Sequence, residues 1–283
     1  MSATVRDASV AGLFYPGAPS ALEADVRRHL VNASARSGEA TVPKAIIVPH
    51  AGYMYAGAIA GNGYARLAAA RTTIRRVVLF GPAHRAWVRG LALPSARAFA
   101  TPLGGIEVDR EAVTRALALP QVVQSDAAHA QEHSLEVQLP FLQQVLDSFR
   151  IVPFAVGDAS AIEVAAVMEL LWGGPETLIV VSSDLSHYHP YAEARTIDRG
   201  TVDSILAMSG ELDHEQACGA TPINGLLVAA RRHALRPELL DLRNSGDTAG
   251  DKSRVVGYAS FAFVGDAAHD GPSPNAARAQ GGT

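Results

Sequence analysis

The sequence predicts an α/β fold in which a mostly parallel central sheet is flanked by helices. Three apolar, β-branched runs have the length of one buried strand each, at residues 44–49, 75–81 and 177–183. The centre of each run, at 45–48, 77–80 and 178–181, is apolar at every position, which is typical of a parallel strand with both faces covered. Helical patterns separate the runs. Alternating strands and helices favour a parallel sheet between two helical layers.

The composition is that of a globular protein with a large core. The chain has 283 residues, of which 48% are hydrophobic and 18% are charged. We expect one domain over residues 1–265. The tail at 266–283 is rich in Ala, Gly and Pro, and we expect it to be disordered.

Charge and cysteine content limit the classes of function. The 24 basic and 28 acidic residues are interspersed and give a net charge of −4, so no basic run indicates binding of nucleic acid or of a membrane surface. No apolar stretch approaches the length of a membrane span, and the first residues lack the apolar core of a secretion signal. Cys218 is the only cysteine, so no intramolecular disulfide forms. We expect a cytoplasmic protein.

The remaining elements follow from local patterns. Asp109 is a predicted helix N-cap. Ser134 is another candidate cap, and Pro140 predicts a kink or break in the helical pattern that begins near Glu132. The expected elements are a helix from 20, a strand at 44–49, a helix to 70, a strand at 75–81, short edge strands around 94–105, a helix at 110–119, the helical pattern from 132, a strand at 150–156, a helix at 160–172, a strand at 177–183, helices at 190–208 and 222–230, and strands at 239–244 and 255–264.

Polar side chains follow the predicted strands where each strand ends. His50 and His84 each follow one strand, next to small residues that leave room around the imidazole. Asp184 and His187 follow the strand at 177–183. Open α/β sheets bind ligands at the carboxyl ends of their strands, so these groups predict a metal or acid/base site at one sheet edge.

Asp184 and His187 are three residues apart and would share a face of a helical turn. One interpretation is an acid/base histidine whose tautomer a carboxylate fixes. In the other, Asp184 caps the turn and His187 packs against Tyr188.

Cys218 lies just before the predicted helix at 222–230, where a helix N-terminus favours thiolate. Such a thiolate binds metal or acts as a nucleophile, whereas a single cysteine is also commonly a small buried residue. Glu132 and His133 could reach the same sheet edge, although a helix-start acid and a surface histidine explain them equally well.

Seven short segments span nearly the whole chain up to Val264. They are 11–16 (AGLFYP), 48–53 (VPHAGY), 81–84 (GPAH), 132–141 (EHSLEVQLPF), 182–188 (SSDLSHY), 218–223 (CGxxPI) and 256–258 (VGY). Taken together and in this order, these segments resemble the Memo family, called AmmeMemoRadiSam system protein B in prokaryotes.

This resemblance implies a fold related to the class III extradiol dioxygenases, which use non-haem iron. It implies a metal on His50, His84 and Cys218, with Asp184 and His187 beside it as catalytic groups. Iron (Fe²⁺) is the first candidate and copper the second, because the dioxygenase's carboxylate ligand is replaced by the softer Cys218 thiolate.

The resemblance also implies partners, namely a radical S-adenosylmethionine enzyme and a third small protein. Three functions stay open: a metal-dependent redox enzyme, a non-catalytic metal- or partner-binding component, and a hydrolase that uses Cys218 with His187 and Asp184.

Overall fold

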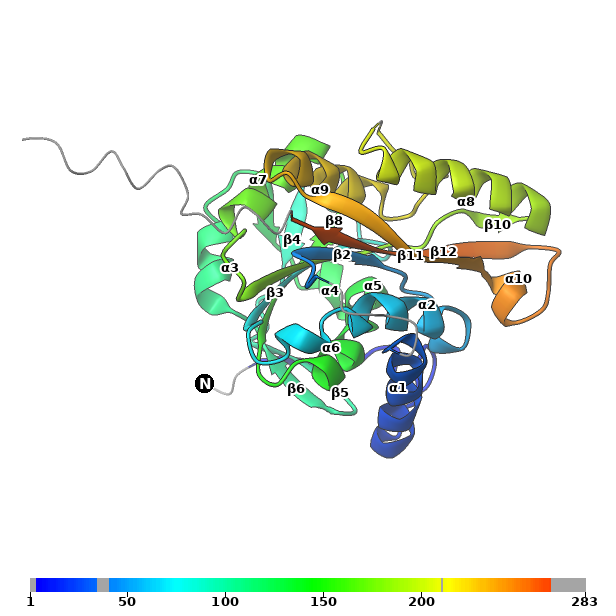
Figure 1. Ribbon diagram of the computed structural model, residues 1–283. Coiled ribbons are helices and arrows are strands. Elements are labelled where there is room, and N and C mark those ends of the chain that lie inside the picture. Colours follow the sequence, from blue (N-terminus) through cyan, green and yellow to red (C-terminus); the bar gives the residue numbers. More distant parts are fainter. Residues whose placement is uncertain (1–3, 35–40, 210, 266–283) are drawn as a thin grey trace, which may run out of the picture.

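The computed structural model describes residues 4–34, 41–209 and 211–265. The expected disordered tail at 266–283 lies outside the described residues. A twisted nine-stranded sheet runs through the middle of the molecule, and helices cover both of its faces (Figure 1). The strand order is β10-β12-β2-β9-β3-β8-β4-β7, with β11 paired to β12.

The strands that carry the site are central and parallel. They are β2 (Ala45–Val48), β9 (Thr177–Ser182), β3 (Arg76–Pro82) and β8 (Arg150–Val156), which pair side by side in this order. Every residue of β2 and β9 is buried, because helices cover both faces. The carboxyl ends of β2, β9 and β3 therefore meet at one edge, as the sequence predicts.

Both flanks of the sheet contain antiparallel pairs, whereas its four central strands are all parallel. On one side β12 (Val255–Val264) runs antiparallel to β2, to β10 (His187–His189) and to β11 (Arg236–Asn244). On the other side β4 (Leu91–Leu93) runs antiparallel to β8 and parallel to β7 (Val122–Gln124).

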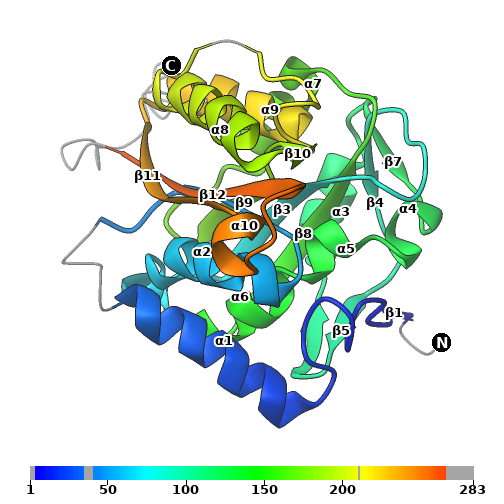
Figure 2. The same cartoon turned by 90° about the vertical axis from the view of Figure 1, so that its right-hand side faces the viewer.

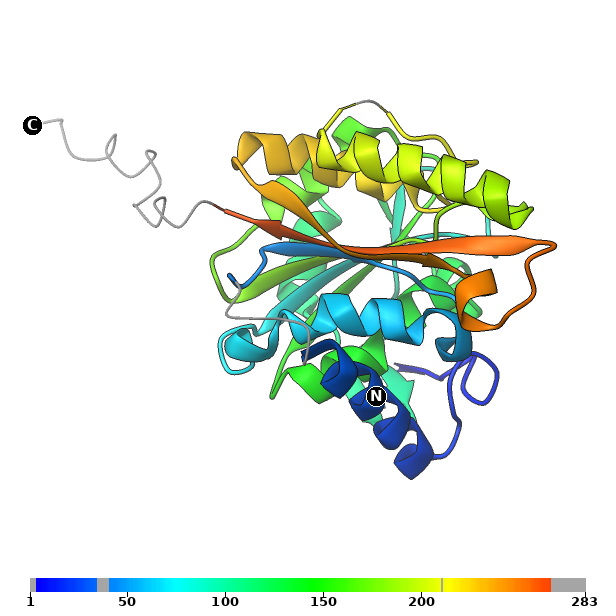
Figure 3. The same cartoon turned by 45° about the vertical axis from the view of Figure 1, so that its right-hand side comes forward.

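Two helical layers enclose the sheet (Figures 1 and 3). One layer contains α7 (Ala161–Leu170), α8 (Tyr191–Leu206) and α9 (Ala220–Arg232). The opposite layer contains α1 (Pro19–Ser34), α2 (Tyr53–Ala65) and α6 (Leu139–Val145). The short elements are α3 (Arg110–Ala116), α4 (Ala127–Ala130), α5 (His133–Glu136), α10 (Ser245–Thr248) and a 3₁₀ turn at Ala68–Ala70.

A second, three-stranded sheet holds the N-terminal segment beside the main body (Figure 2). In it β1 (Val5–Arg6) pairs with β5 (Ala98–Thr101), which pairs with β6 (Gly104–Glu107). The sequence predicts short edge strands here. Of these, β4 does join the central sheet, whereas β5 and β6 leave it to pair with β1.

Several local predictions are confirmed and one is wrong. The Asp109 side chain accepts a hydrogen bond from the backbone N–H of Ala112 and caps α3. The helical pattern breaks before Pro140, which lies in the first turn of α6, where its missing N–H is harmless. Ser134 does not cap α5. The cap is Glu132, whose carboxylate accepts the N–H of Ser134. Among the described residues, no helix has the length and apolar composition to cross a membrane.

Candidate metal centre

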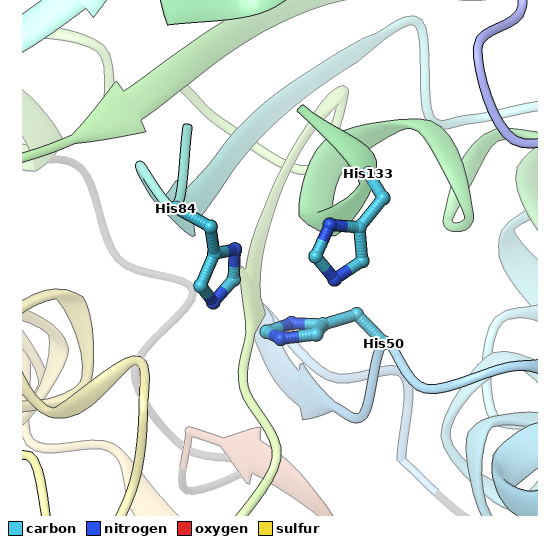
Figure 4. A group of neighbouring side chains, drawn as sticks. All are labelled: His50, His84 and His133. Atoms are coloured by element: carbon cyan, nitrogen blue, oxygen red, sulfur yellow. The ribbon is translucent and has the colours of Figure 1, made fainter. Parts of the chain in front are cut away.

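Three imidazoles converge at the carboxyl edge of the central strands. His50 follows β2, His84 follows β3, and His133 is the first residue of α5. One ring nitrogen from each lies within 4.8 Å of the others. Figure 4 shows the three rings turned toward one another around a common space. Three histidines at this spacing could hold a metal ion.

Hydrogen bonds fix the tautomer of His50. Its Nδ1 lies 2.9 Å from Oγ of Ser182. That hydroxyl donates its one proton to the carbonyl of Ser134 (2.6 Å) and accepts from Nε2 of Gln138 (2.8 Å). The Ser182 oxygen is therefore an acceptor for His50, so His50 Nδ1 carries the proton. Nε2 of His50 is therefore the nitrogen that keeps a lone pair, and Sγ of Cys218 lies 3.3 Å from it.

Glu132 fixes His84 in the same way. Oε1 of Glu132 lies 2.9 Å from Nδ1 of His84. A carboxylate only accepts, so Nδ1 is the protonated nitrogen and Nε2 keeps its lone pair. Burial alone would raise the pKa of Glu132, but hydrogen bonds from the His84 ring and from the backbone lower it to about 2. Glu132 is therefore an anion at neutral pH.

His133 completes the cluster from the other side. Its Nδ1 lies 3.4 Å from Oε1 of Glu132 but makes no hydrogen bond, and its ring packs on that of Phe14 with centroids 4.8 Å apart. Burial lowers the pKa of His133, although the charge of Glu132 opposes this. Burial also holds the pKa of His50 well below its usual value, and His84 and His133 lower it further. Neutral imidazole is the form that binds metal.

Cys218 lies beside the cluster. Its Sγ is 3.3 Å from Nε2 of His50. Among the described residues, the group whose ligand atoms lie within 4.8 Å of one another consists of the three histidines. Cys218 is not part of that group. Burial raises the pKa of this thiol to about 12, and the carboxylate of Asp184 adds to the effect. The N-terminus of α9 is expected to lower the pKa of Cys218, but burial of the thiol outweighs this effect.

Asp184 is buried directly under the centre. Its Oδ1 accepts the backbone N–H groups of His50 (2.8 Å) and Ala51 (3.3 Å), and its Oδ2 is 4.0 Å from Nε2 of His50. Burial raises the pKa of Asp184 against these hydrogen bonds and against the charge of His187. Asp184 thus holds the backbone of the loop that carries His50.

His187 lies in β10 and is half-buried. Its ring contacts that of Tyr188 with centroids 5.7 Å apart. Tyr188 has a left-handed backbone (φ 63), which is uncommon for a bulky residue and often marks a functional site. The Asp184 carboxylate accepts from the backbone of His50 and Ala51, and the ring of His187 contacts that of Tyr188, so the described contacts favour the packing interpretation of His187. Its catalytic role, like metal ligation by His50, His84 and Cys218, stays a prediction.

Two members of this site carry little signal in the sequence. From the residues alone, Glu132 and His133 could reach the sheet edge, but a helix-start acid and a surface histidine explain them equally well. The sequence signal that could have found them is the motif segment 132–141, which contains both residues. In the structure, a Cβ at Gly81 would lie 2.6 Å from Oγ of Ser134. Glycine thus lets α5 approach the end of β3 and brings His133 beside His84.

The donor set fits a transition metal. His50 and His84 present lone pairs whose opposite nitrogens are held by Ser182 and Glu132, which is the arrangement that orients metal-binding histidines in proteins. Imidazole nitrogen with a neighbouring thiol suits zinc, copper and iron better than the oxygen-seeking Mg²⁺ or Ca²⁺.

Comparisons with known proteins agree with the family resemblance of the motifs. The chain matches the family model described as "Memo-like protein" over residues 6–262. A "MEMO1 family protein" of Archaeoglobus fulgidus is 38% identical over 275 residues, which cover 92% of this chain and 99% of that one. Another of Aquifex aeolicus is 36% identical and covers 92% of this chain and 99% of its own.

A solved structure supports the fold alone. The crystal structure of an uncharacterized protein from Escherichia coli K12 has a TM-score of 0.51 at 14% identity and covers 78% of this chain and 99% of that chain. Since the family model and the relatives extend over most of the sequence, this chain belongs to the Memo family.

Proposed function

We propose that this protein binds one transition-metal ion at the three-histidine cluster of His50, His84 and His133, with Cys218 as an additional ligand. The observation that carries the proposal is the convergence of three ring nitrogens while Ser182 and Glu132 hold the opposite nitrogens of two of them. Fe²⁺ is the ion that we favour, because the motifs resemble a family related to non-haem iron dioxygenases. Copper is the second candidate, because the thiol is a soft ligand.

A bound ion would supply Lewis-acid or redox chemistry. The chain's own residues would do the rest. Cys218 would give up its proton when it binds, since only thiolate is a good ligand. Asp184 would hold the His50 loop in place. His187 would be the group that exchanges a proton with a bound molecule. On this view the protein is a metal-dependent oxidoreductase.

Metal content tests the site. We would purify the protein without chelator and measure iron, copper and zinc in wild type, His84→Ala, His133→Ala and Cys218→Ser. His233→Ala is the matched control, because His233 stacks on Trp172 beyond the far end of α9, about 20 Å from Cys218. We expect close to one ion per chain in wild type and control and a loss in the three site variants. If wild type holds no ion even after anaerobic reconstitution, the proposed metal site is wrong.

A non-catalytic component is the second candidate. Its support is the ligand set: the three-residue group found among the described residues contains no carboxylate, unlike the dioxygenase sites that the motifs resemble. Oxygen uptake after anaerobic iron loading, with a catechol or another small reductant, separates the two. Uptake in wild type that is absent in His187→Gln supports the enzyme, whereas no uptake with any reductant supports the binding component.

We also propose that the protein acts as component B of the AmmeMemoRadiSam system, with a radical S-adenosylmethionine enzyme and a third protein as partners. The support for this is the motif resemblance. Pull-down of the two partners from cells that express all three proteins is the test.

A further inference from the structure

The N-terminal segment at residues 5–15 is bound to the histidine cluster by a buried guanidinium. Arg6 is 8% exposed and lies over the ring of Phe99. Its Nε donates to the carbonyl of His129 (3.0 Å), and its NH2 donates to the carbonyl of Glu132 (2.7 Å). These two carbonyls flank the turn that leads into α5. One planar group thus fixes both sides of the turn that carries Glu132 and His133.

The guanidinium is paired with a fully buried carboxylate. NH1 of Arg6 forms an ion pair with Glu136, one turn after Glu132 in the chain. Oε2 of Glu136 also accepts the backbone N–H and hydroxyl of Ser9, both at 2.8 Å. Its Oε1 accepts the N–H of Val10 (3.0 Å) and the hydroxyl of Tyr15 (2.6 Å). Every lone-pair direction of this carboxylate is therefore used, so the charge pair has a single geometry.

The same segment reaches the cluster at a second point. The ring of Phe14 packs on His133, and the carbonyl of Phe14 accepts the N–H of Tyr53, three residues after His50. The segment therefore contacts the elements that carry two of the three histidines. Its backbone also pairs with β5 through β1, which anchors Arg6 outside the central sheet.

We propose that Arg6 is a positioning residue of the metal centre. It fixes the turn before α5 so that the carboxylate of Glu132 meets Nδ1 of His84 and faces Nδ1 of His133. The inference rests on the proposed metal site, but the positioning itself is a property of the metal-free protein. Groups that orient the ligands of a metal change its affinity by about 10–100-fold when they are removed.

Two substitutions separate positioning from stability. Arg6→Gln removes the charge and leaves Glu136 buried without its partner, which destabilises the fold. Arg6→Lys keeps a charge for Glu136 but cannot also hold both carbonyls. The matched control is Arg76→Gln, which breaks the pair between Nε of Arg76 and Oδ2 of Asp109 (2.7 Å). Arg76 starts β3, about 20 Å along the strand from the His84 end.

The first readout needs no metal. Long-range ¹H–¹⁵N spectra of the metal-free proteins report the tautomer and the hydrogen bonding of each histidine. We expect Arg6→Lys to lose the hydrogen-bonded Nδ1–H of His84 and to shift the His133 signals. The His50 signals should stay, because Ser182 holds that ring. If the His84 and His133 signals of Arg6→Lys match those of wild type, the proposal is wrong, whether or not the protein binds an ion.

The second readout is Co²⁺ affinity and visible absorption at a temperature where all variants are folded. We expect binding about tenfold weaker or worse, with a changed spectrum, in Arg6→Lys. Arg76→Gln should bind as wild type does while its Tm falls. If Arg76→Gln loses as much Co²⁺ affinity as Arg6→Lys, Arg6 has only a structural role and the proposal is wrong. Wild type that takes up no Co²⁺ while Arg6→Lys loses the His84 signal would leave the positioning role standing and reject the proposed function.

Discussion

Glu132 holds both the ring and the backbone of His84. Its Oε1 lies 2.9 Å from Nδ1 of His84, and its Oε2 accepts the backbone N–H of the same residue at 2.6 Å. The carboxylate also caps α5 through the N–H of Ser134. One buried anion thus links the end of β3 to the start of α5, and so joins two of the three imidazoles.

Replacing that anion by an amide should weaken metal binding. In Glu132→Gln the side chain keeps its volume, but its NH₂ group can donate to Nδ1 of His84 and favour the wrong tautomer. We expect an affinity for Co²⁺ or Fe²⁺ about 10–100-fold lower, measured by competition with a chelator. Glu107→Gln is the control, because it breaks only an exposed pair with Arg150. Unchanged affinity in Glu132→Gln would contradict the orienting role.

Stability should fall in acid partly through Glu136. Burial would raise its pKa, but the charge of Arg6 and hydrogen bonds from Tyr15 and Ser9 lower it below the usual 4.5. A carboxyl with a depressed pKa in the folded state contributes stability that is complete above the unfolded value and is lost as the pH falls through the folded value. The free energy of unfolding should therefore drop below about pH 4.5.

Glu136→Gln isolates this contribution. The variant should be less stable at neutral pH, by about 3–5 kcal/mol for one partner of a buried pair. The difference from wild type should shrink as the pH falls from 5 to 3. The measurement is a series of urea titrations of both proteins at four pH values from 3 to 7. A difference that stays constant with pH would show that the carboxylate charge is not what stabilises the segment.

The thiol of Cys218 should react slowly when no metal is bound. Because burial raises its pKa to about 12, only about one molecule in ten thousand is thiolate at pH 8. The rate of alkylation by iodoacetamide should rise about tenfold per pH unit up to pH 10, whereas that of glutathione levels off near pH 9. A rate that levels off near neutrality would instead favour the metal-free cysteine hydrolase.

The close approach of α5 to β3 should depend on Gly81. In Gly81→Ala the new Cβ would lie 2.6 Å from Oγ and 3.1 Å from Cβ of Ser134, inside the core. We expect a loss of about 1–3 kcal/mol of unfolding free energy. Gly105→Ala is the matched control, since its Cβ meets nothing within 4 Å. Urea denaturation of both variants gives the comparison, and equal stabilities would refute the packing constraint.

The sequence was informative wherever a residue's role depends on its immediate neighbours. The runs at 44–49 and 177–183 have uninterrupted apolar centres at 45–48 and 178–181, and β2 and β9 are buried at every position. His50 and His84 directly follow such runs, so their place at the sheet edge could be predicted from the strand ends alone. The Asp109 cap and the break before Pro140 follow from one residue type at one position.

Contacts between distant segments could not be predicted in this way. His133 and Glu132 belong to the site because the turn before α5 lies against β3, about fifty residues away in the chain, and nothing in the local pattern encodes that distance. The thiol of Cys218 shows the same limit. Its position before α9 predicts a lowered pKa, but burial beside Asp184 raises it, and burial is a property of the packed molecule.

The sequence by itself determined the fold class, the strands that end at the site, and two of the three histidines. Only the tertiary structure decided that His133 is the third histidine and that Ser182 and Glu132 orient the imidazoles of His50 and His84. It also decided that Arg6 donates to the carbonyl of Glu132. The physical reason is the range of the forces involved. Backbone propensity and hydrophobic periodicity act over a few residues, whereas a hydrogen bond or a ligand distance is set by where the whole chain packs.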